Sequence, residues 1–250
     1  MAQNLAVRVA VISDVHANLY ALEEVLGEID GNPPAEIWCL GDTVGYGPHP
    51  NECCTLVQER CSLVLAGNHD LIALGSAAVD VEDFNPDAAA ASLWTKDELS
   101  DESRVFLEAL QPTAEVDGAQ LFHGSPRDPV WDYVLDAIVA VESFALTSAR
   151  VVLVGHTHVS TALVLRPGRL EGGHAADELE ARLEEGRWLL NPGSVGQPRD
   201  GDPRAAFLEL DLEEHWARFR RVAYPVSRTQ EEIRKRGLPD SLAERLAHGV

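Results

Sequence analysis

The stretch Ser62-Leu63-Val64-Leu65-Ala66-Gly67-Asn68-His69-Asp70 decides how this chain is interpreted. Its apolar first half predicts a buried strand, and Gly67 predicts a turn at the end of that strand. An amide, an imidazole and a carboxylate then follow one another at the strand tip. Such polar groups are costly in an apolar core, whereas their oxygen and nitrogen atoms are common metal ligands. The stretch therefore predicts a metal site at a strand end.

Other apolar runs along the chain also end in polar tips. These tips are Ser13-Asp14-Val15-His16, Gly41-Asp42, Phe122-His123-Gly124 and Gly155-His156-Thr157-His158. Residues 5–12, 35–40 and 62–66 are predicted strands, and predicted helices near 19–29 and 51–60 separate them. This βαβαβ order predicts a parallel layer, in which ligands bind at the carboxyl ends of the strands. We therefore expect the tips to converge on one site.

The second half of the chain is rich in short predicted strands. They span 113–116, 119–122, 151–154, 160–165, 188–190, 205–210 and 216–222, and a helix near 137–148 interrupts them. Short strands with tight connections predict a second, mixed sheet. No linker separates the halves, so we predict a single domain over residues 1–250.

Three segments carry no ligand pattern. Residues 71–110, with helices predicted at 86–97 and 101–110, are expected to be structural, with a lid role as an alternative. Residues 172–186 are predicted to form an exposed acidic loop. Capping boxes that begin at Ser227 and Ser241 predict two final helices.

Composition excludes some classes of partner. The chain has 250 residues, 45% of them hydrophobic, but no apolar run approaches the roughly 20 residues that span a bilayer. The start, Met1–Asn4, lacks the basic and apolar segments of a secretory signal, and we expect a cytoplasmic protein with free thiols. The net charge of −21 argues against a groove for polymeric nucleic acid, and no membrane partner is expected.

The ordered set D-x-H, G-D, G-N-H-D, H and G-H-T-H resembles the calcineurin-like metallophosphoesterases. The resemblance covers nearly the whole chain, from Asp14 to beyond His158. It implies an α/β fold, a four-layer α/β/β/α sandwich of two mixed sheets, with a dinuclear metal centre at the strand ends. The motifs at 45–48, 123–128 and 191–199 look like the small prokaryotic phosphodiesterases and the asymmetrical type of diadenosine tetraphosphate hydrolase.

Carried over residue by residue, the resemblance implies two divalent ions, with Mn expected first and Fe, Co, Ni or Zn as alternatives. One ion would be held by Asp14, His16, Asp42 and His158, and the other by Asp42, Asn68, His123 and His156. Asp42 would bridge the ions, and a bridging hydroxide would attack phosphorus. His69 would protonate the leaving oxygen or stabilise the transition state, and Asp70 would orient His69 and raise its pKa.

The expected substrate is a small phosphorylated molecule, with a nucleotide as one form of it. Ser194, Arg127 and Arg199 are candidate phosphate contacts, although either arginine could instead pair with the acidic surface. The alternatives to a phosphodiesterase are an asymmetrical diadenosine tetraphosphate hydrolase, a phosphoprotein phosphatase and a non-catalytic scaffold of the same fold. Thr43 and Leu71 stand where phosphoprotein phosphatases usually carry arginines, which disfavours that alternative. The presence of every implied ligand disfavours the scaffold.

Overall fold

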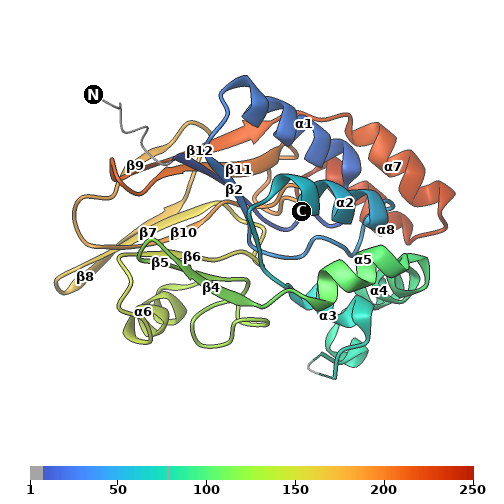
Figure 1. Cartoon of the computed structure of the whole chain (residues 1–250), viewed down its shortest axis with the longest axis horizontal. Coiled ribbons are helices and arrows are strands. Elements are labelled where there is room, and N and C mark those ends of the chain that lie inside the picture. The colour runs from blue at the N-terminus through green and yellow to red at the C-terminus, as the bar shows by residue number, and fades with distance from the viewer. Residues whose placement is uncertain (1–7, 78) are drawn as a thin grey trace.

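The computed structural model of the chain describes residues 8–77 and 79–250 and contains two six-stranded mixed sheets (Figure 1). The first sheet has the order β3-β2-β1-β11-β12-β9. Its strands are β1 (Arg8–Ile12), β2 (Glu36–Cys39), β3 (Leu63–Val64), β9 (Glu180–Arg182), β11 (Ala205–Asp211) and β12 (Trp216–Val222). The second sheet has the order β4-β5-β6-β10-β7-β8. Its strands are β4 (Thr113–Val116), β5 (Ala119–Phe122), β6 (Val151–Leu153), β7 (Thr161–Arg166), β8 (Arg169–His174) and β10 (Arg187–Asn191).

Helices cover the outer face of each sheet, so the four-layer sandwich is confirmed. The helices α1 (Leu19–Gly31), α2 (Pro50–Arg60) and α7 (Val226–Lys235) lie on the first sheet, and α6 (Ala137–Ala145) lies on the second (Figure 1). The remaining helices are α3 (Asn68–Leu74), α4 (Pro86–Glu98), α5 (Asp101–Glu108) and α8 (Asp240–Glu244), with 3₁₀ turns at Val81–Asp83 and Arg245–Ala247. None of the helices in the described residues is long and apolar enough to cross a membrane.

The apolar runs of β1 and β2 are continuous because these two strands are buried on both faces. In β1, Val9 and Val11 join the cluster between the two sheets, where Leu121 of the second sheet also lies. Ala10 and Ile12 point to the opposite face, into the cluster under the helices. This alternation of side chains across a strand leaves no face of β1 in water.

The stretch at 62–70 differs from its prediction. The strand β3 has only two residues, Leu63–Val64, and it is a half-buried edge strand rather than a buried one. The polar tip is the start of helix α3, because Gly67 is its N-cap and the Asp70 side chain accepts a hydrogen bond from the Gly67 amide. Asn68, His69 and Asp70 thus lie on the first helical turn.

Two other local predictions are wrong. Residues 172–186 are not a loop, because β8 continues to His174 and β9 pairs antiparallel with β12. The capping boxes are absent, since α7 and α8 begin directly after Pro225 and Pro239 and have no side-chain cap. The other predicted strands are confirmed with ends shifted by one or two residues, except that residues 5–7 of the first lie outside the described residues. The single-domain organisation over 1–250 stays a prediction.

Candidate metal centre

The candidate ligands follow the ends of neighbouring strands. Asp14 and His16 follow β1, Asp42 follows β2, Asn68 opens α3, His123 follows β5, and His156 and His158 follow β6. The loops after β1 and β2 are joined, because the amides of Asp14 and His16 donate hydrogen bonds to the carbonyls of Gly41 and Asp42. All of the candidate ligands are buried. The fold therefore brings together the residues that the sequence predicted as ligands.

Most of these side chains are placed by an unusual backbone conformation. Five of the candidate ligands have φ between +48° and +64°, namely Asp14, His16, Asp42, His156 and His158. This left-handed region costs a non-glycine residue on the order of 1 kcal/mol or more, and such strain concentrates at functional sites. Close approach also requires glycine here, because a Cβ at Gly67 would lie 2.0 Å from Asp42 Oδ1.

Three imidazoles are oriented in the same way. The Nδ1 atoms of His16, His123 and His158 lie 3.1, 2.9 and 2.6 Å from the backbone carbonyl oxygens of Val44, Leu40 and Gln197. Because each carbonyl can only accept a hydrogen bond, Nδ1 carries the proton, and in the neutral ring Nε2 keeps its lone pair. Histidines that bind metals are held in this way.

The lone pairs face carboxylate oxygens that have no hydrogen-bond partner. Asp14 Oδ1 lies 3.4 Å from His158 Nε2 and 3.9 Å from His16 Nε2. Asp42 Oδ2 lies 3.6 Å from His16 Nε2 and 3.4 Å from His123 Nε2. Both oxygens are buried and unpartnered among the described residues. Since acceptors cannot satisfy one another, a cation between them is the natural partner, and these residues fit a metal.

A second group of potential ligands shares Asp42. His123 Nε2 lies 3.1 Å from the Asn68 side-chain oxygen, and Asp42, His123 and His156 each place one ligand atom within 4.8 Å of the others. Asp14, His16 and His158 form a separate group by the same criterion. Asp42 thus lies between two sets of donors. This is the arrangement expected of a carboxylate that bridges two ions.

The pKa values of several side chains in the centre are shifted far from their ordinary values. Burial raises the pKa of Asp14 to about 7 and lowers the pKa values of His16 and His158 well below the ordinary range. Burial also acts to lower the pKa of His123, but the adjacent Asp42 carboxylate raises it to about 9. A divalent cation would favour ionised carboxylates and neutral imidazoles at every one of these positions.

His69 lies beside the candidate ligands, with its ring 4.9 Å from that of His16. Burial lowers its pKa to about 4, and its Nδ1 is buried without a hydrogen-bond partner among the described residues. The prediction that Asp70 orients His69 and raises its pKa is wrong. The Asp70 oxygens accept hydrogen bonds from the amides of Val44 and Gly67, at 3.0 and 2.9 Å, so Asp70 caps α3 and ties it to the loop after β2.

The three candidate phosphate contacts lie in different surroundings. Arg127 forms ion pairs with Asp132 and Glu142, and the structure does not bring it to the centre. The Ser194 hydroxyl is fully buried, where it donates to the Asp14 carbonyl and accepts from an amide. Arg199 is close to the centre, because its amide donates to the His158 carbonyl.

Aromatic side chains form a rim, of which sequence reasoning missed Phe84, Trp131 and Tyr133. Phe84 and Tyr46 contact the His69 ring, at centroid distances of 4.9 and 4.4 Å. Tyr133 stacks on His156 at 3.9 Å, and the Trp131 carbonyl lies 3.2 Å from His156 Nε2. The available signal was the pair of aromatics at 131 and 133, in the loop after a predicted ligand strand.

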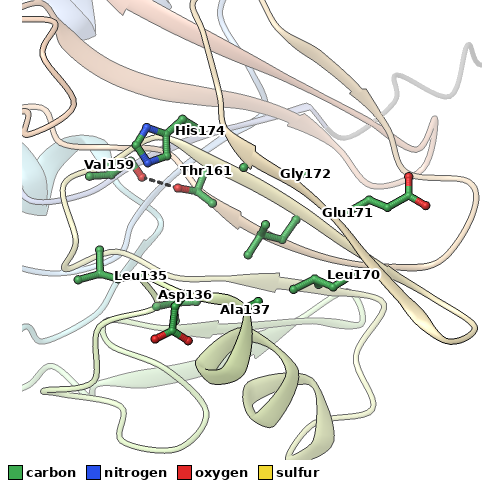
Figure 2. Close-up of a pocket in the computed structure, with 12 residues that line it drawn as sticks. Leu135, Asp136, Ala137, Val159, Thr161, Leu170, Glu171, Gly172 and His174 are labelled. Carbon is green, nitrogen blue, oxygen red and sulfur yellow. Dashed lines mark hydrogen bonds between the residues drawn. The ribbon is translucent and has the colours of Figure 1, made fainter.

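A pocket of about 250 Å³ lies between the start of α6 and the strands β7 and β8 (Figure 2). Its lining includes Val134, which follows Tyr133, and Val159, which follows His158. In Figure 2 the start of α6 at Asp136 and Ala137 lies opposite His174 and Thr161, whose hydroxyl donates to the Val159 carbonyl. The lining of this pocket is largely apolar, and none of the candidate ligands belongs to it.

Comparison with known proteins agrees with this geometry. A family model described as the calcineurin-like phosphoesterase superfamily domain matches residues 7–215. The chain belongs to this superfamily. Members of the superfamily are metal-dependent, which is consistent with the clusters of histidine and aspartate described above.

Two relatives and one further solved structure match over almost the whole chain. The Methanocaldococcus jannaschii protein MJ0912 is 37% identical over 247 residues, which cover 96% of this chain and 98% of that protein. A metallophosphoesterase from Sphaerobacter thermophilus, known from its crystal structure, is 41% identical in sequence. Its structure matches with a TM-score of 0.88, and the match covers 98% of this chain and 100% of that chain. The crystal structure of the Pyrococcus horikoshii protein PH1004 matches with a TM-score of 0.77, and the match covers 97% of this chain and 98% of that chain. Because its sequence is only 21% identical, this similarity shows the fold alone.

Proposed function

We propose that this chain is a dinuclear metal-dependent phosphoesterase that hydrolyses a small phosphate ester, with a phosphodiester or nucleotide as the expected form. One observation carries the proposal. The Nε2 atoms of three histidines, each oriented by a backbone carbonyl, face two buried carboxylate oxygens that have no hydrogen-bond partner among the described residues. A cation at each side of Asp42 would satisfy all of these atoms.

In this proposal the first ion is held by Asp14, His16, Asp42 and His158, and the second by Asp42, Asn68, His123 and His156. Two divalent cations, Mn expected first, would activate water for attack on phosphorus and neutralise the charge of the phosphoryl oxygens. They would also attract an anion into a protein whose net charge is −21. We expect His69 to donate a hydrogen bond or a proton to the leaving oxygen, and we expect Arg199, whose amide donates to the His158 carbonyl, to contact the substrate.

The rival functions share the fold but differ at single positions. A phosphoprotein phosphatase is disfavoured because Thr43 and Leu71 occupy the positions of its usual arginines, and Thr43 is fully buried. A scaffold without catalysis has no need for the buried, unpartnered oxygens of Asp14 and Asp42. We also propose that the protein acts in the cytoplasm. Its proposed substrate is a small molecule, and neither polymeric nucleic acid nor a membrane is an expected partner.

The first test uses protein that has been stripped with a chelator and reloaded separately with Mn, Co, Ni or Zn. We expect hydrolysis of bis-p-nitrophenyl phosphate, measured as released nitrophenolate, to be at least about a hundredfold faster with the best metal than without metal. No hydrolysis with any of the four metals would favour the scaffold. The same reloaded protein would then be offered dinucleoside polyphosphates, cyclic nucleotides, phosphopeptides and single-stranded DNA. A marked preference for phosphopeptides would replace the proposal by the phosphatase.

A further inference from the structure

Two arginines meet at one neutral oxygen beside the candidate centre. The Gln197 side-chain oxygen accepts hydrogen bonds from Arg199 Nη2 at 2.8 Å and from Arg245 Nη1 at 3.3 Å. The backbone carbonyl of the same glutamine accepts the hydrogen bond from His158 Nδ1 at 2.6 Å. One residue therefore links two guanidinium groups to a candidate metal ligand.

Arg199 has no carboxylate within 4.0 Å among the described residues, although the chain has 41 acidic and 20 basic residues, whereas Arg245 Nε donates a hydrogen bond to the Val250 backbone oxygen at 2.7 Å. The adjacent Asp200 pairs with Arg221 instead. Arg199 Nε is buried and has no partner in the part of the chain that the structure describes. Burial, and then the neighbouring Arg199, lower the pKa of Arg245. Two like charges held close together are costly, and an anion between them would lower that cost.

The pair lies one aromatic ring away from the candidate ligands. Arg199 Cζ is 5.6 Å from the centre of the Tyr46 ring, and Arg199 Nη2 is 3.2 Å from the Tyr46 hydroxyl. The Tyr46 ring is 4.7 Å from the His16 ring and 4.4 Å from the His69 ring. On its other side, Arg245 lines an open groove of about 580 Å³. A ligand group that extends from the centre towards this groove would meet both guanidinium groups.

We propose that Arg199 and Arg245 bind a second phosphate group of the substrate, so that the preferred substrate is a phosphate ester with a further phosphate next to the one that is cleaved. This inference rests on the proposed phosphoesterase function. A guanidinium presents its N–H groups as a planar fork that matches two phosphate oxygens, and two forks match the charge of a phosphate dianion. Arg127, in contrast, is already paired with two carboxylates.

The test compares two ligands by calorimetry on the metal-loaded protein. Imidodiphosphate, which has two linked phosphoryl groups and resists hydrolysis, is expected to bind at least about tenfold more tightly than orthophosphate. Arg245→Met should lower the ratio of the affinity for imidodiphosphate to the affinity for orthophosphate about tenfold. Arg245→Lys should lower this ratio less, because lysine keeps the positive charge but lacks the planar set of N–H donors. Arg234→Met is the matched control, since Arg234 lines the same groove but pairs with Asp240, and its ratio should equal that of the wild type.

Equal affinity for the two ligands in the wild type, or an unchanged ratio in Arg245→Met, would overturn the inference. If Arg245→Met does not fold, as judged by thermal unfolding, Arg245→Lys decides: an unchanged ratio in that variant overturns the inference as well. Failure of the proposed function has a different signature. Wild-type protein would then not hydrolyse bis-p-nitrophenyl phosphate, which carries a single phosphate, whatever its affinity for imidodiphosphate.

Discussion

Asp42→Asn is expected to lower the rate of phosphodiester hydrolysis by at least about a thousandfold and to reduce the bound metal below two ions per chain. Asp42 Oδ2 is the buried oxygen that lies between the two groups of donors. It is 3.6 Å from His16 Nε2 and 3.4 Å from His123 Nε2. An amide at this position has no negative charge, and its NH₂ group would oppose a cation.

This substitution separates metal binding from folding. Asp42 Oδ1 accepts a hydrogen bond from the His69 amide at 2.8 Å, and the asparagine oxygen can replace it. Thermal unfolding of the metal-free variant should therefore be close to that of the metal-free wild type. Asp97→Asn, which removes an exposed carboxylate of α4, is the matched control and should keep both metal content and activity. Full activity in Asp42→Asn would refute a bridging role.

His69→Ala is expected to keep both ions and to lower turnover by about a hundredfold to a thousandfold. The His69 ring packs against Tyr46 and Phe84, and its Nδ1 has no hydrogen-bond partner among the described residues. Its pKa of about 4 makes the imidazole neutral at neutral pH, so its single N–H group is what it offers to a leaving oxygen. The measurement is turnover of bis-p-nitrophenyl phosphate at saturating metal, together with metal content by mass spectrometry.

The two outcomes that contradict this role point in different directions. Unchanged turnover would mean that His69 only packs. Loss of metal would mean that His69 is a ligand, which is a real alternative because one of its nitrogens lies within 4.8 Å of ligand atoms of His16 and Asp42. His69→Asn, which leaves a smaller cavity than alanine, would show whether a loss of turnover reflects poor packing.

The fold and the meeting of the polar strand tips were predictable because they depend on local pattern. Apolar runs that end in Asp14, Asp42 or His156 are legible in the sequence, and parallel strands bring their carboxyl ends to one edge. The length of β3 was not predictable, since it depends on its position at the sheet edge. The wrong capping boxes have a local cause that was overlooked, the prolines at 225 and 239.

Roles that depend on distant partners were not predictable. Asp70 is next to His69 in the sequence, but its oxygens bind the amides of Val44 and Gly67. Ser194 and Arg127 look alike as phosphate contacts until burial and ion pairing separate them. The meeting of Arg245 with Gln197 joins positions 48 residues apart, and no spacing rule foretells it.

The central claim is that this chain holds two divalent cations at the ends of its strands. Native mass spectrometry of wild-type protein, stripped with a chelator and titrated with Mn²⁺, tests it most directly. We expect a mass increase of two ions per chain, with hydrolysis of bis-p-nitrophenyl phosphate rising as the second ion binds. A single ion at saturation, or full activity before any ion binds, would contradict it.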